Sequence, residues 1–276
     1  MDVKIIIFTD LDGTLLDHHT YSHHDADEAL SQVNKRKASL VLCSSKTKEE
    51  IEVYRKRLSN RDPFILENGG AIYIPKECKD LAGKFDHEDS DYFTIIIGTE
   101  YGKLVDAFDK IKRRTGVNAK GINEFTLDEV VQLTSLQKEE AVLAMKREYT
   151  LPFVVPGGAE EGEAIQKEIL LSGFNFTEGA NFKYLMGAND KGKAVRILVD
   201  IFKRNYPEED IITVGIGDSL NDLPMLEAVD RPFLVKKVSG DYDDRIRVKN
   251  LGYADGIGPV GWNKVVLRLF NKKGFV

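Results

Sequence analysis

The chain has 276 residues, of which 42% are hydrophobic and 30% charged, a balance typical of a globular protein with one large domain or two smaller ones. Its 39 basic and 45 acidic side chains give a net charge of −6 with no basic block, so nucleic acid is not an expected partner. The sequence has no membrane-length apolar run and no signal-peptide pattern, so we expect a cytoplasmic protein without a membrane partner.

A strand-like run opens the chain and is followed at once by two aspartates. Residues 3–8 are rich in β-branched side chains and predict a buried parallel strand. Because side chains alternate along an extended segment, Asp10 and Asp12 are expected to point the same way from the strand's carboxyl end, where open α/β sheets bind ligands. Gly13 permits a tight turn there. The pair favours a chemical site in which one aspartate attacks an electrophile and the other moves a proton. The alternative is that both only cap the next loop.

A second buried strand ends in a polar segment of the same kind. It is predicted at 39–43, after a helix at about 24–36, and a helix with Thr47 as its N-cap is predicted at about 47–59. Ser44 follows the strand directly. Its hydroxyl is placed to bind a phosphoryl oxygen at a strand end that leads into a helix, or it serves only as a cap.

From about residue 80 to 185 the pattern changes character. Short strands at 64–66 and 71–74, on either side of the turn at 67–70, come before this change. After it, strands predicted at 92–97, 151–155, 174–177 and 182–186 alternate with helices at 101–115, 126–147 and 160–172. We therefore expect a second domain at 83–186, inserted between the two parts of a core domain at 1–82 and 187–276.

The core pattern resumes after the insertion. It predicts, in order, a helix at 190–205, a strand at 211–214, a helix at 219–228, a strand at 233–235 and a helix at 261–271. Alternating βα units of this kind predict an α/β fold with a doubly wound, largely parallel sheet. Lys191 opens the first of these helices. Its cation is placed to neutralise Asp10 and a transferring phosphoryl group, or it is a solvated surface residue.

A second pair of aspartates lies where the predicted strand at 211–214 turns into a helix. Asp218 and Asp222 are four residues apart, which places both carboxylates on one side of a first helical turn. Oxygen ligands of this kind suit Mg²⁺, although an N-cap with an acidic first turn would look similar. By contrast, the four histidines within residues 18–24 lack zinc-site spacing and precede a helix in a solvated segment, so they predict no metal site.

Four motifs in this order resemble those of the haloacid dehalogenase superfamily, most of whose members are phosphatases. The resemblance implies a Rossmann-like core with an inserted α+β cap of the C2 type, and Mg²⁺ as cofactor. It implies that Asp10 attacks phosphorus to form an aspartyl-phosphate, while Asp12 protonates the leaving oxygen and later deprotonates water. Catalytic roles thus fall on Asp10, Asp12, Ser44 and Lys191, and metal binding on Asp10, Asp12, Asp218 and Asp222.

Three longer segments resemble the mannosyl-3-phosphoglycerate phosphatases of that superfamily. They are residues 42–47, 67–72 and 189–194. The resemblance implies a phosphorylated sugar acid as substrate, and it implies binding by Ser45, Lys46, Asn68, Gly69, Lys183 and Asn221. One departure is that Asn181-Phe182-Lys183-Tyr184-Leu185 stands where the family has an Arg-Phe-x-His-Leu-like sequence. Lys183 then replaces the missing cation or faces solvent, and Asn68-Gly69 is also a good turn sequence.

Other functions remain open from the sequence. The same motifs would suit a phosphatase for glucosyl-3-phosphoglycerate or simple hexose phosphates. They also occur in phosphomannomutase-like phosphosugar mutases, which need a sugar bisphosphate. A non-catalytic phosphosugar sensor is a third class, but a sensor has no physical need for Asp12. We expect a monomer or homodimer whose partner is a small phosphorylated sugar or sugar acid.

Overall fold

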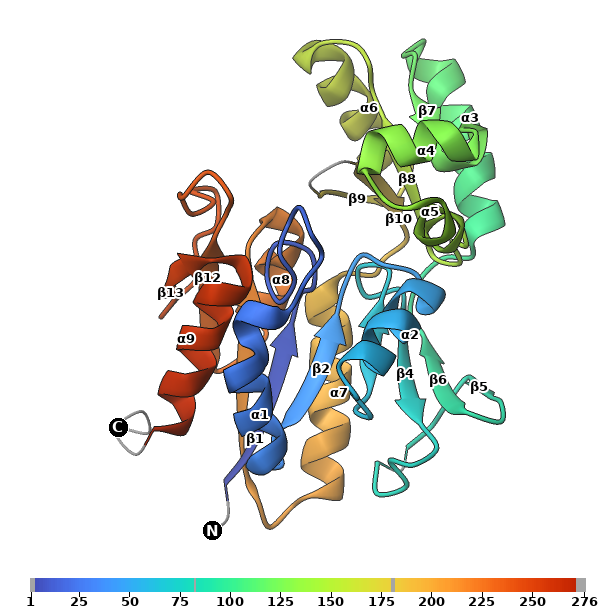
Figure 1. Ribbon diagram of the computed structural model, residues 1–276. Coiled ribbons are helices and arrows are strands. Elements are labelled where there is room, and N and C mark those ends of the chain that lie inside the picture. Colours follow the sequence, from blue (N-terminus) through green and yellow to red (C-terminus); the bar gives the residue numbers. More distant parts are fainter. Residues whose placement is uncertain (1–2, 82, 180–181, 272–276) are drawn as a thin grey trace.

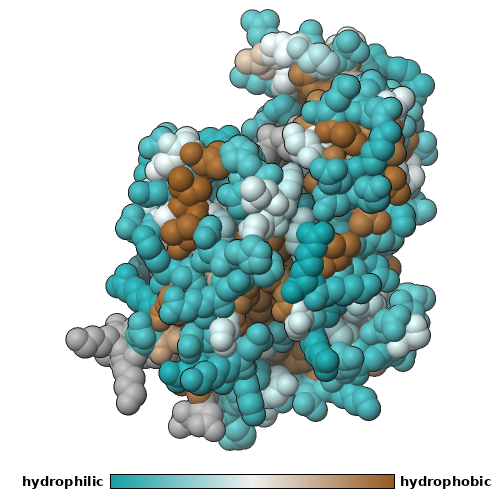
Figure 2. Space-filling model, viewed as in Figure 1, coloured by the Kyte–Doolittle hydropathy of each residue, from teal (hydrophilic) through white to brown (hydrophobic). Residues whose placement is uncertain are grey.

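The computed structural model describes residues 3–81, 83–179 and 182–271. Within these ranges the strands form one nine-stranded sheet and one four-stranded sheet, the smaller one lying at the top of the view in Figure 1. No helix in the described ranges is both long enough and apolar enough to cross a bilayer. On the face of the molecule seen in Figure 2, hydrophilic residues predominate and the hydrophobic ones lie among them in small groups.

The large sheet is mixed, with a parallel part and an antiparallel edge. In spatial order its strands are β13 (Gly252–Ile257), β12 (Arg231–Lys236), β11 (Asp210–Gly217), β1 (Val3–Thr9), β2 (Ser39–Cys43), β3 (Phe64–Leu66), β4 (Ala71–Pro75), β6 (Tyr92–Ile96) and β5 (His87–Glu88). The strands from β13 to β3 are parallel, and those from β3 to β5 pair antiparallel. Strand order reverses at β1, with β2 on one side and β11 on the other. Such a switch point is where open α/β sheets bind ligands.

Helices cover both faces of this sheet, which confirms the predicted doubly wound class. One face packs against α1 (Asp27–Lys35), α2 (Lys48–Arg57) and α9 (Gly258–Phe270), and the other against α7 (Lys191–Asn205) and α8 (Leu223–Glu227). Strand β1 shows why two layers are needed. Ile5 and Ile7 belong to one hydrophobic cluster, while Ile6 and Phe8 belong to the other. A strand that is apolar on both sides must be covered on both sides.

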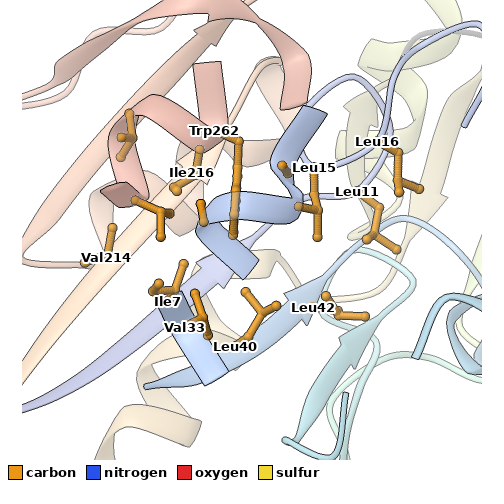
Figure 3. Close-up of a cluster of buried hydrophobic side chains, with 14 of the residues drawn as sticks. Ile7, Leu11, Leu15, Leu16, Val33, Leu40, Leu42, Val214, Ile216 and Trp262 are labelled. Atoms are coloured by element: carbon orange, nitrogen blue, oxygen red, sulfur yellow. The ribbon is translucent and has the colours of Figure 1, made fainter. Parts of the chain in front are cut away.

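Trp262 of α9 joins the hydrophobic core to the end of β1. Figure 3 shows its ring among Ile216, Leu15 and Val33, and the side chain is fully buried. Its indole N–H donates to the Thr9 hydroxyl at 3.0 Å, and that hydroxyl donates to the Asp10 carbonyl at 2.8 Å. A buried indole usually finds such a partner. Two hydrogen bonds through the Thr9 hydroxyl therefore connect the backbone at Asp10 to the hydrophobic core.

The smaller sheet carries its own helices and its own core. Its strands, in spatial order, are β7 (Lys120–Gly121), β8 (Thr150–Val154), β10 (Lys183–Met186) and β9 (Asn175–Glu178). With it go α3 (Tyr101–Thr115), α4 (Leu127–Thr134), α5 (Lys138–Ala144) and α6 (Ala159–Leu171), together with the 3₁₀ helix η2 (Ile122–Glu124). Leu104, Phe108 and Phe153 are among the buried residues that join these elements. We call residues 101–186 the cap.

Two sequence expectations about the inserted region need correction. Strands β5 and β6 pair with β4 in the large sheet, because the chain makes another antiparallel turn before it leaves the sheet. We therefore propose that the inserted domain begins near residue 97 rather than 83. The single helix expected at 126–147 is two helices, α4 and α5, because Ser135 takes a left-handed conformation (φ 60°) that ends α4.

The loop after β3 ties the cap to the core. Glu67, Asn68 and Gly69 all have positive φ values (45°, 55° and 85°), and a Cβ on Gly69 would lie 2.1 Å from the Asp190 carbonyl oxygen. The Glu67 side chain is buried, and its carboxylate accepts the backbone N–H groups of residues 148, 149 and 150 at 2.8, 3.2 and 2.8 Å. It also accepts the Thr150 hydroxyl at 2.6 Å. One core carboxylate thus holds the start of cap strand β8.

We expect Glu67→Gln to destabilise the protein by about 2–3 kcal/mol, because an amide NH₂ would face buried N–H donors that need an acceptor. Urea unfolding followed by circular dichroism measures this change. Glu160→Gln, at an exposed position of α6, is the matched control and should leave the midpoint unchanged. A Glu67→Gln midpoint equal to the wild type would contradict the anchoring role of this carboxylate.

Candidate active site

The elements that meet at the switch point bring four charged side chains together. Asp10 follows β1, and its backbone N–H is held by the Ile216 carbonyl of β11 at 3.0 Å. Asp218 follows β11, and Asp222 ends the 3₁₀ helix η3 (Leu220–Asp222). Lys191 is the first residue of α7. The loops at neighbouring strand ends and one helix start therefore converge on a single point.

Lys191 lies at the centre of this group and is fully buried. Its ammonium donates to Asp10 Oδ1 at 2.7 Å and to Asp222 Oδ1 at 2.6 Å. Burial alone would lower the pKa of Lys191, but the two carboxylates outweigh burial and raise it. Lys191 is thus a permanent cation at the site, and the alternative of a solvated surface lysine is excluded.

The three carboxylates leave a negative charge that Lys191 does not balance. Burial raises the pKa of Asp10 well above its usual range, with Lys191 opposing the shift. Burial, with the nearby Asp222 carboxylate, raises the pKa of Asp218 to about 7. Ionised, the three carboxylates and the one ammonium sum to −2, which disfavours the charged forms in a buried site.

A divalent cation fits this donor set. Ligand atoms of Asp10, Asp218 and Asp222 all lie within 4.8 Å of one another. Asp222 is already engaged, because one oxygen accepts Lys191 and the other accepts the backbone N–H groups of Asp218 and Ser219 at 3.0 and 3.2 Å. Asp10 and Asp218 therefore have the freer oxygens, and Asp222 orients the group around them. Oxygen donors with net charge −2 are the chemistry that a hard dication requires.

The carboxylate of Asp12 lies outside this group of three carboxylates, and the role expected for Asp12 at the metal stays a prediction. The chain stops being extended after Thr9 and turns, so Asp10 and Asp12 do not point the same way as residues two apart along a strand would. Gly13, with φ 76°, makes the turn. The Asp12 carboxylate instead pairs with Lys46, Oδ2 to Nζ at 2.9 Å, and is about one-third exposed. This places an acid/base candidate beside the cluster and outside it.

Residues 44–47, the polar segment after β2, have different roles: some line the site and others cap the helix that follows. Ser44 is buried, and its hydroxyl accepts the Lys46 backbone N–H at 3.3 Å, which is the capping arrangement considered from the sequence. Ser45 and Lys46 line the central cavity. The predicted N-cap at Thr47 is confirmed, with Glu50 completing a capping box at the start of α2.

A cavity of about 310 Å³ separates the core cluster from the cap. Core residues on its wall include Asp10, Asp12, Lys46, Asp218, Asn221, Lys237 and Arg245. Cap residues on its wall include Ile122, Val130, Leu136, Arg147, Phe182 and Tyr184. The cavity is charged at its core end and largely apolar at its cap end, as expected of a pocket for a small molecule with one strongly polar group.

Three predicted substrate residues do not reach this cavity in the described ranges. Lys183 pairs with Glu178, and its neighbour Tyr184 faces the cavity because side chains alternate along β10. Gly69 packs against the Asp190 backbone. Asn68 is buried behind Asn221, whose amide donates to the Asn68 side-chain oxygen at 3.3 Å. Asn68 and Gly69 therefore support the site, as their turn-forming alternative suggested.

Several cavity residues escaped the sequence analysis. Arg147 follows α5, and Lys237 and Arg245 lie in the loop after β12 that was not assigned to any element. Lys237 and Arg245 both pair with Asp243, at 2.7 Å each, and Arg245 also reaches Glu178 of the cap at 3.5 Å. A basic residue in a polar loop carries no periodic signal, so only tertiary structure could reveal these positions.

A second group with metal-ligand chemistry lies on the surface. His23, His24 and Asp27 offer ligand atoms within 4.8 Å of one another. Both imidazoles already pair with Asp27, at 2.8 and 3.2 Å, at the start of α1. His24 and Asp27 are exposed, so the contacts are those of ordinary helix-end ion pairs.

Comparisons with known proteins agree with this geometry. Residues 7–97 match the model of the haloacid dehalogenase-like hydrolases. The chain is 43% identical over 270 residues to the glucosyl-3-phosphoglycerate/mannosyl-3-phosphoglycerate phosphatase of Methanococcoides burtonii, covering 98% of each chain. It is 32% identical over 232 residues to the mannosyl-3-phosphoglycerate phosphatase of Pyrococcus furiosus, covering 83% of this chain and 90% of that one. A phosphatase of the haloalkanoate superfamily from Bacteroides thetaiotaomicron shares the fold, with a TM-score of 0.63 at 16% identity over 97% and 94% of the two chains.

The structure thus has a doubly wound α/β core, a cap, and a centre of aspartates and one lysine at the carboxyl edge of the parallel strands. The chain belongs to the haloacid dehalogenase-like hydrolases and is a phosphatase of that family. The expected family and enzyme class are therefore confirmed.

Proposed function

We propose that this phosphatase hydrolyses the phosphomonoester of a phosphorylated sugar acid, either glucosyl- or mannosyl-3-phosphoglycerate, through an aspartyl-phosphate on Asp10. The observation that carries the proposal is one cavity that joins the Asp10 cluster to Lys46 and to a cap wall. The names of the Methanococcoides and Pyrococcus relatives support the same substrate class. We also propose that the protein is cytoplasmic and is a monomer or a homodimer.

The reaction uses Asp10 and Asp12 in two steps. The Asp10 oxygen not held by Lys191 attacks phosphorus, and the bond from phosphorus to the glycerate oxygen breaks as the new bond forms. Asp12 gives its proton to the departing oxygen. Water then attacks the aspartyl-phosphate, Asp12 takes a proton from that water, and inorganic phosphate leaves with Asp10 restored. Lys191 offsets the negative charge that the phosphoryl oxygens bring beside Asp10.

Mg²⁺ completes the charge balance of the proposed site. Asp10 and Asp218 would hold it, and Asp222 would orient both Asp218 and Lys191 through the contacts described above. When bound, a dication reduces the repulsion between a carboxylate nucleophile and the phosphoryl oxygens. This role follows from the surplus of −2 among the buried groups.

The position of Lys46 favours an acidic substrate. In a 3-phosphoglycerate ester only two carbons separate the carboxylate from the phosphate ester oxygen, so a cation that binds the carboxylate must lie near the phosphoryl site. Lys46 lines the cavity and contacts Asp12, which is the proposed proton donor to the departing oxygen. The apolar cap wall, including Phe182 and Tyr184, then faces the sugar ring.

Phosphate release from a panel of esters tests the proposal. We expect kcat/KM for glucosyl- or mannosyl-3-phosphoglycerate to exceed that for glucose 6-phosphate by roughly tenfold to several hundredfold, as buried polar recognition allows. EDTA should abolish turnover and Mg²⁺ should restore it. Equal rates on simple hexose phosphates would reject the sugar-acid assignment, and a requirement for a sugar bisphosphate would indicate a mutase. Binding of the esters without turnover would indicate a sensor.

A further inference from the structure

Four side chains of alternating charge, which we call the row, extend from the site in the core to the cap; they are those of Asp12, Lys46, Glu50 and Arg147. Asp12 Oδ2 lies 2.9 Å from Lys46 Nζ, and Lys46 Nζ lies 3.5 Å from Glu50 Oε1. Glu50 Oε2 in turn lies 3.7 Å from Arg147 Nη2. The side chains of Lys46, Glu50 and Arg147 are each only 6–7% exposed. Water therefore screens these charges poorly, and each one influences its neighbours.

Arg147 is the cap's contribution to this row. It follows α5, and its remaining N–H groups donate to the Ala144 carbonyl of that helix at 2.7 Å and to the Ser45 carbonyl of the core at 2.7 Å. The core segment at 44–47 is therefore held by a cap residue. The Thr47 hydroxyl strengthens the junction by donating to the Leu143 carbonyl at 3.0 Å.

Lys46 contacts two carboxylates, those of Asp12 and Glu50, and the charge of Arg147 beside Glu50 determines which of them Lys46 holds. The row is neutral as it stands, with two carboxylates and two cations. Without Arg147 it would carry −1, and Glu50 would keep a buried charge with Lys46 as its nearest cation. Removing one partner of a buried ion pair leaves such an uncompensated charge. Lys46 would then shift toward Glu50 and away from Asp12.

We propose that Arg147 is a positioning residue for Asp12, acting through Glu50 and Lys46, so that proton transfer in the core depends on the docked cap. This inference rests on the proposed acid/base role of Asp12 and does not depend on which sugar acid is the substrate. By neutralising Glu50, Arg147 leaves Lys46 free to hold the Asp12 carboxylate in place.

The test compares two esters in one enzyme preparation. Glucose 6-phosphate has a poor leaving group that needs a proton, whereas p-nitrophenyl phosphate has a good one that does not. For Arg147→Met we expect kcat/KM on glucose 6-phosphate to fall by roughly ten- to a hundredfold, and on p-nitrophenyl phosphate by less than about threefold. The ratio of the two values is independent of the folded fraction, so partial unfolding cannot mimic the result. An equal loss on both esters would overturn the proposal.

A rescue variant separates positioning from packing. Glu50→Gln keeps an acceptor for the Thr47 backbone N–H but removes the competing charge. In the Arg147→Met background it should return kcat/KM on glucose 6-phosphate to within about threefold of wild type, a coupling that a double-mutant cycle measures. If kcat/KM on glucose 6-phosphate does not recover in the double variant, the proposal that Arg147 acts through Glu50 is wrong.

The matched control removes another arginine between the same two helices. Arg57 of α2 pairs with Glu140 of α5 at 3.5 Å, but these side chains are 47% and 28% exposed, far more than those of the row, and the pair lies outside the row. Arg57→Met should leave both kcat/KM values unchanged. Asp12→Asn separates the two proposals. If this variant loses kcat/KM equally on both esters, the role proposed for Asp12 fails. If it loses more on glucose 6-phosphate than on p-nitrophenyl phosphate, only the role of Arg147 is in question.

Discussion

Asp10→Asn is expected to reduce kcat by about 10⁴-fold or more, because the amide cannot replace the carboxylate as nucleophile and the other groups act only with it. The fold should survive. Asp10 belongs to a buried group with surplus negative charge, and the amide removes one unit of that charge while Lys191 keeps its contact with Asp222. We expect an unfolding temperature equal to or above that of the wild type. Steady-state phosphate release and thermal unfolding check both points.

Acid-quenched mass spectrometry adds a direct readout of the covalent step. The wild type should carry a phosphoryl group on the peptide containing Asp10 during turnover, and Asp10→Asn should not. Asp25→Asn, at an exposed position before α1, is the matched control and should behave as the wild type. Full turnover by Asp10→Asn would remove Asp10 from the nucleophile role and would leave the carboxylate cluster with a metal-binding role only.

Asp12→Asn is expected to lower kcat by roughly 10²- to 10⁴-fold on alkyl phosphates, the usual range for loss of a general acid and base. On p-nitrophenyl phosphate the first step should be largely spared, because nitrophenolate leaves without a proton. The second step still needs a base for water. The variant should therefore release a burst of nitrophenolate close to one equivalent and then turn over slowly.

Rapid mixing with optical detection distinguishes this outcome from others. Asp10→Asn provides the reference, since it should give no burst at all. A variant of Asp12 with unchanged kinetics on alkyl phosphates would mean that another group moves the proton.

Local sequence signals were sufficient to predict the core of this fold and the centre of the site. Strand β1 reads as buried on both faces, and its side chains do divide between two hydrophobic clusters. Asp10, Lys191 and Asp218 stand at the ends of parallel strands or the start of a helix, and parallel strands bring such ends to one edge. Their positions in the sequence therefore imply that these three side chains lie close together.

The partners of these residues could not be predicted, because they depend on how distant segments meet. Asp12 faces Lys46 because the chain turns after Thr9, and an extended segment was the wrong assumption there. The charge of Lys183 predicts a substrate contact, but the register of β10 turns Tyr184 toward the cavity instead. Arg147 had no signal at all, since its importance comes from reaching Ser45 across the domain boundary.

The left-handed loop at 67–70 also determines how the molecule would open. Its Gly70 carbonyl accepts the N–H groups of Ile97 and Gly98, where the chain leaves for the cap, and Glu67 holds the start of β8. The cap also meets the core through Glu178 and Arg245, a partly exposed contact at 3.5 Å. Buried hydrogen bonds outlast such a surface pair. If the cap moved relative to the core, the loop would act as the hinge, and the Glu178–Arg245 pair would separate before the buried hydrogen bonds do.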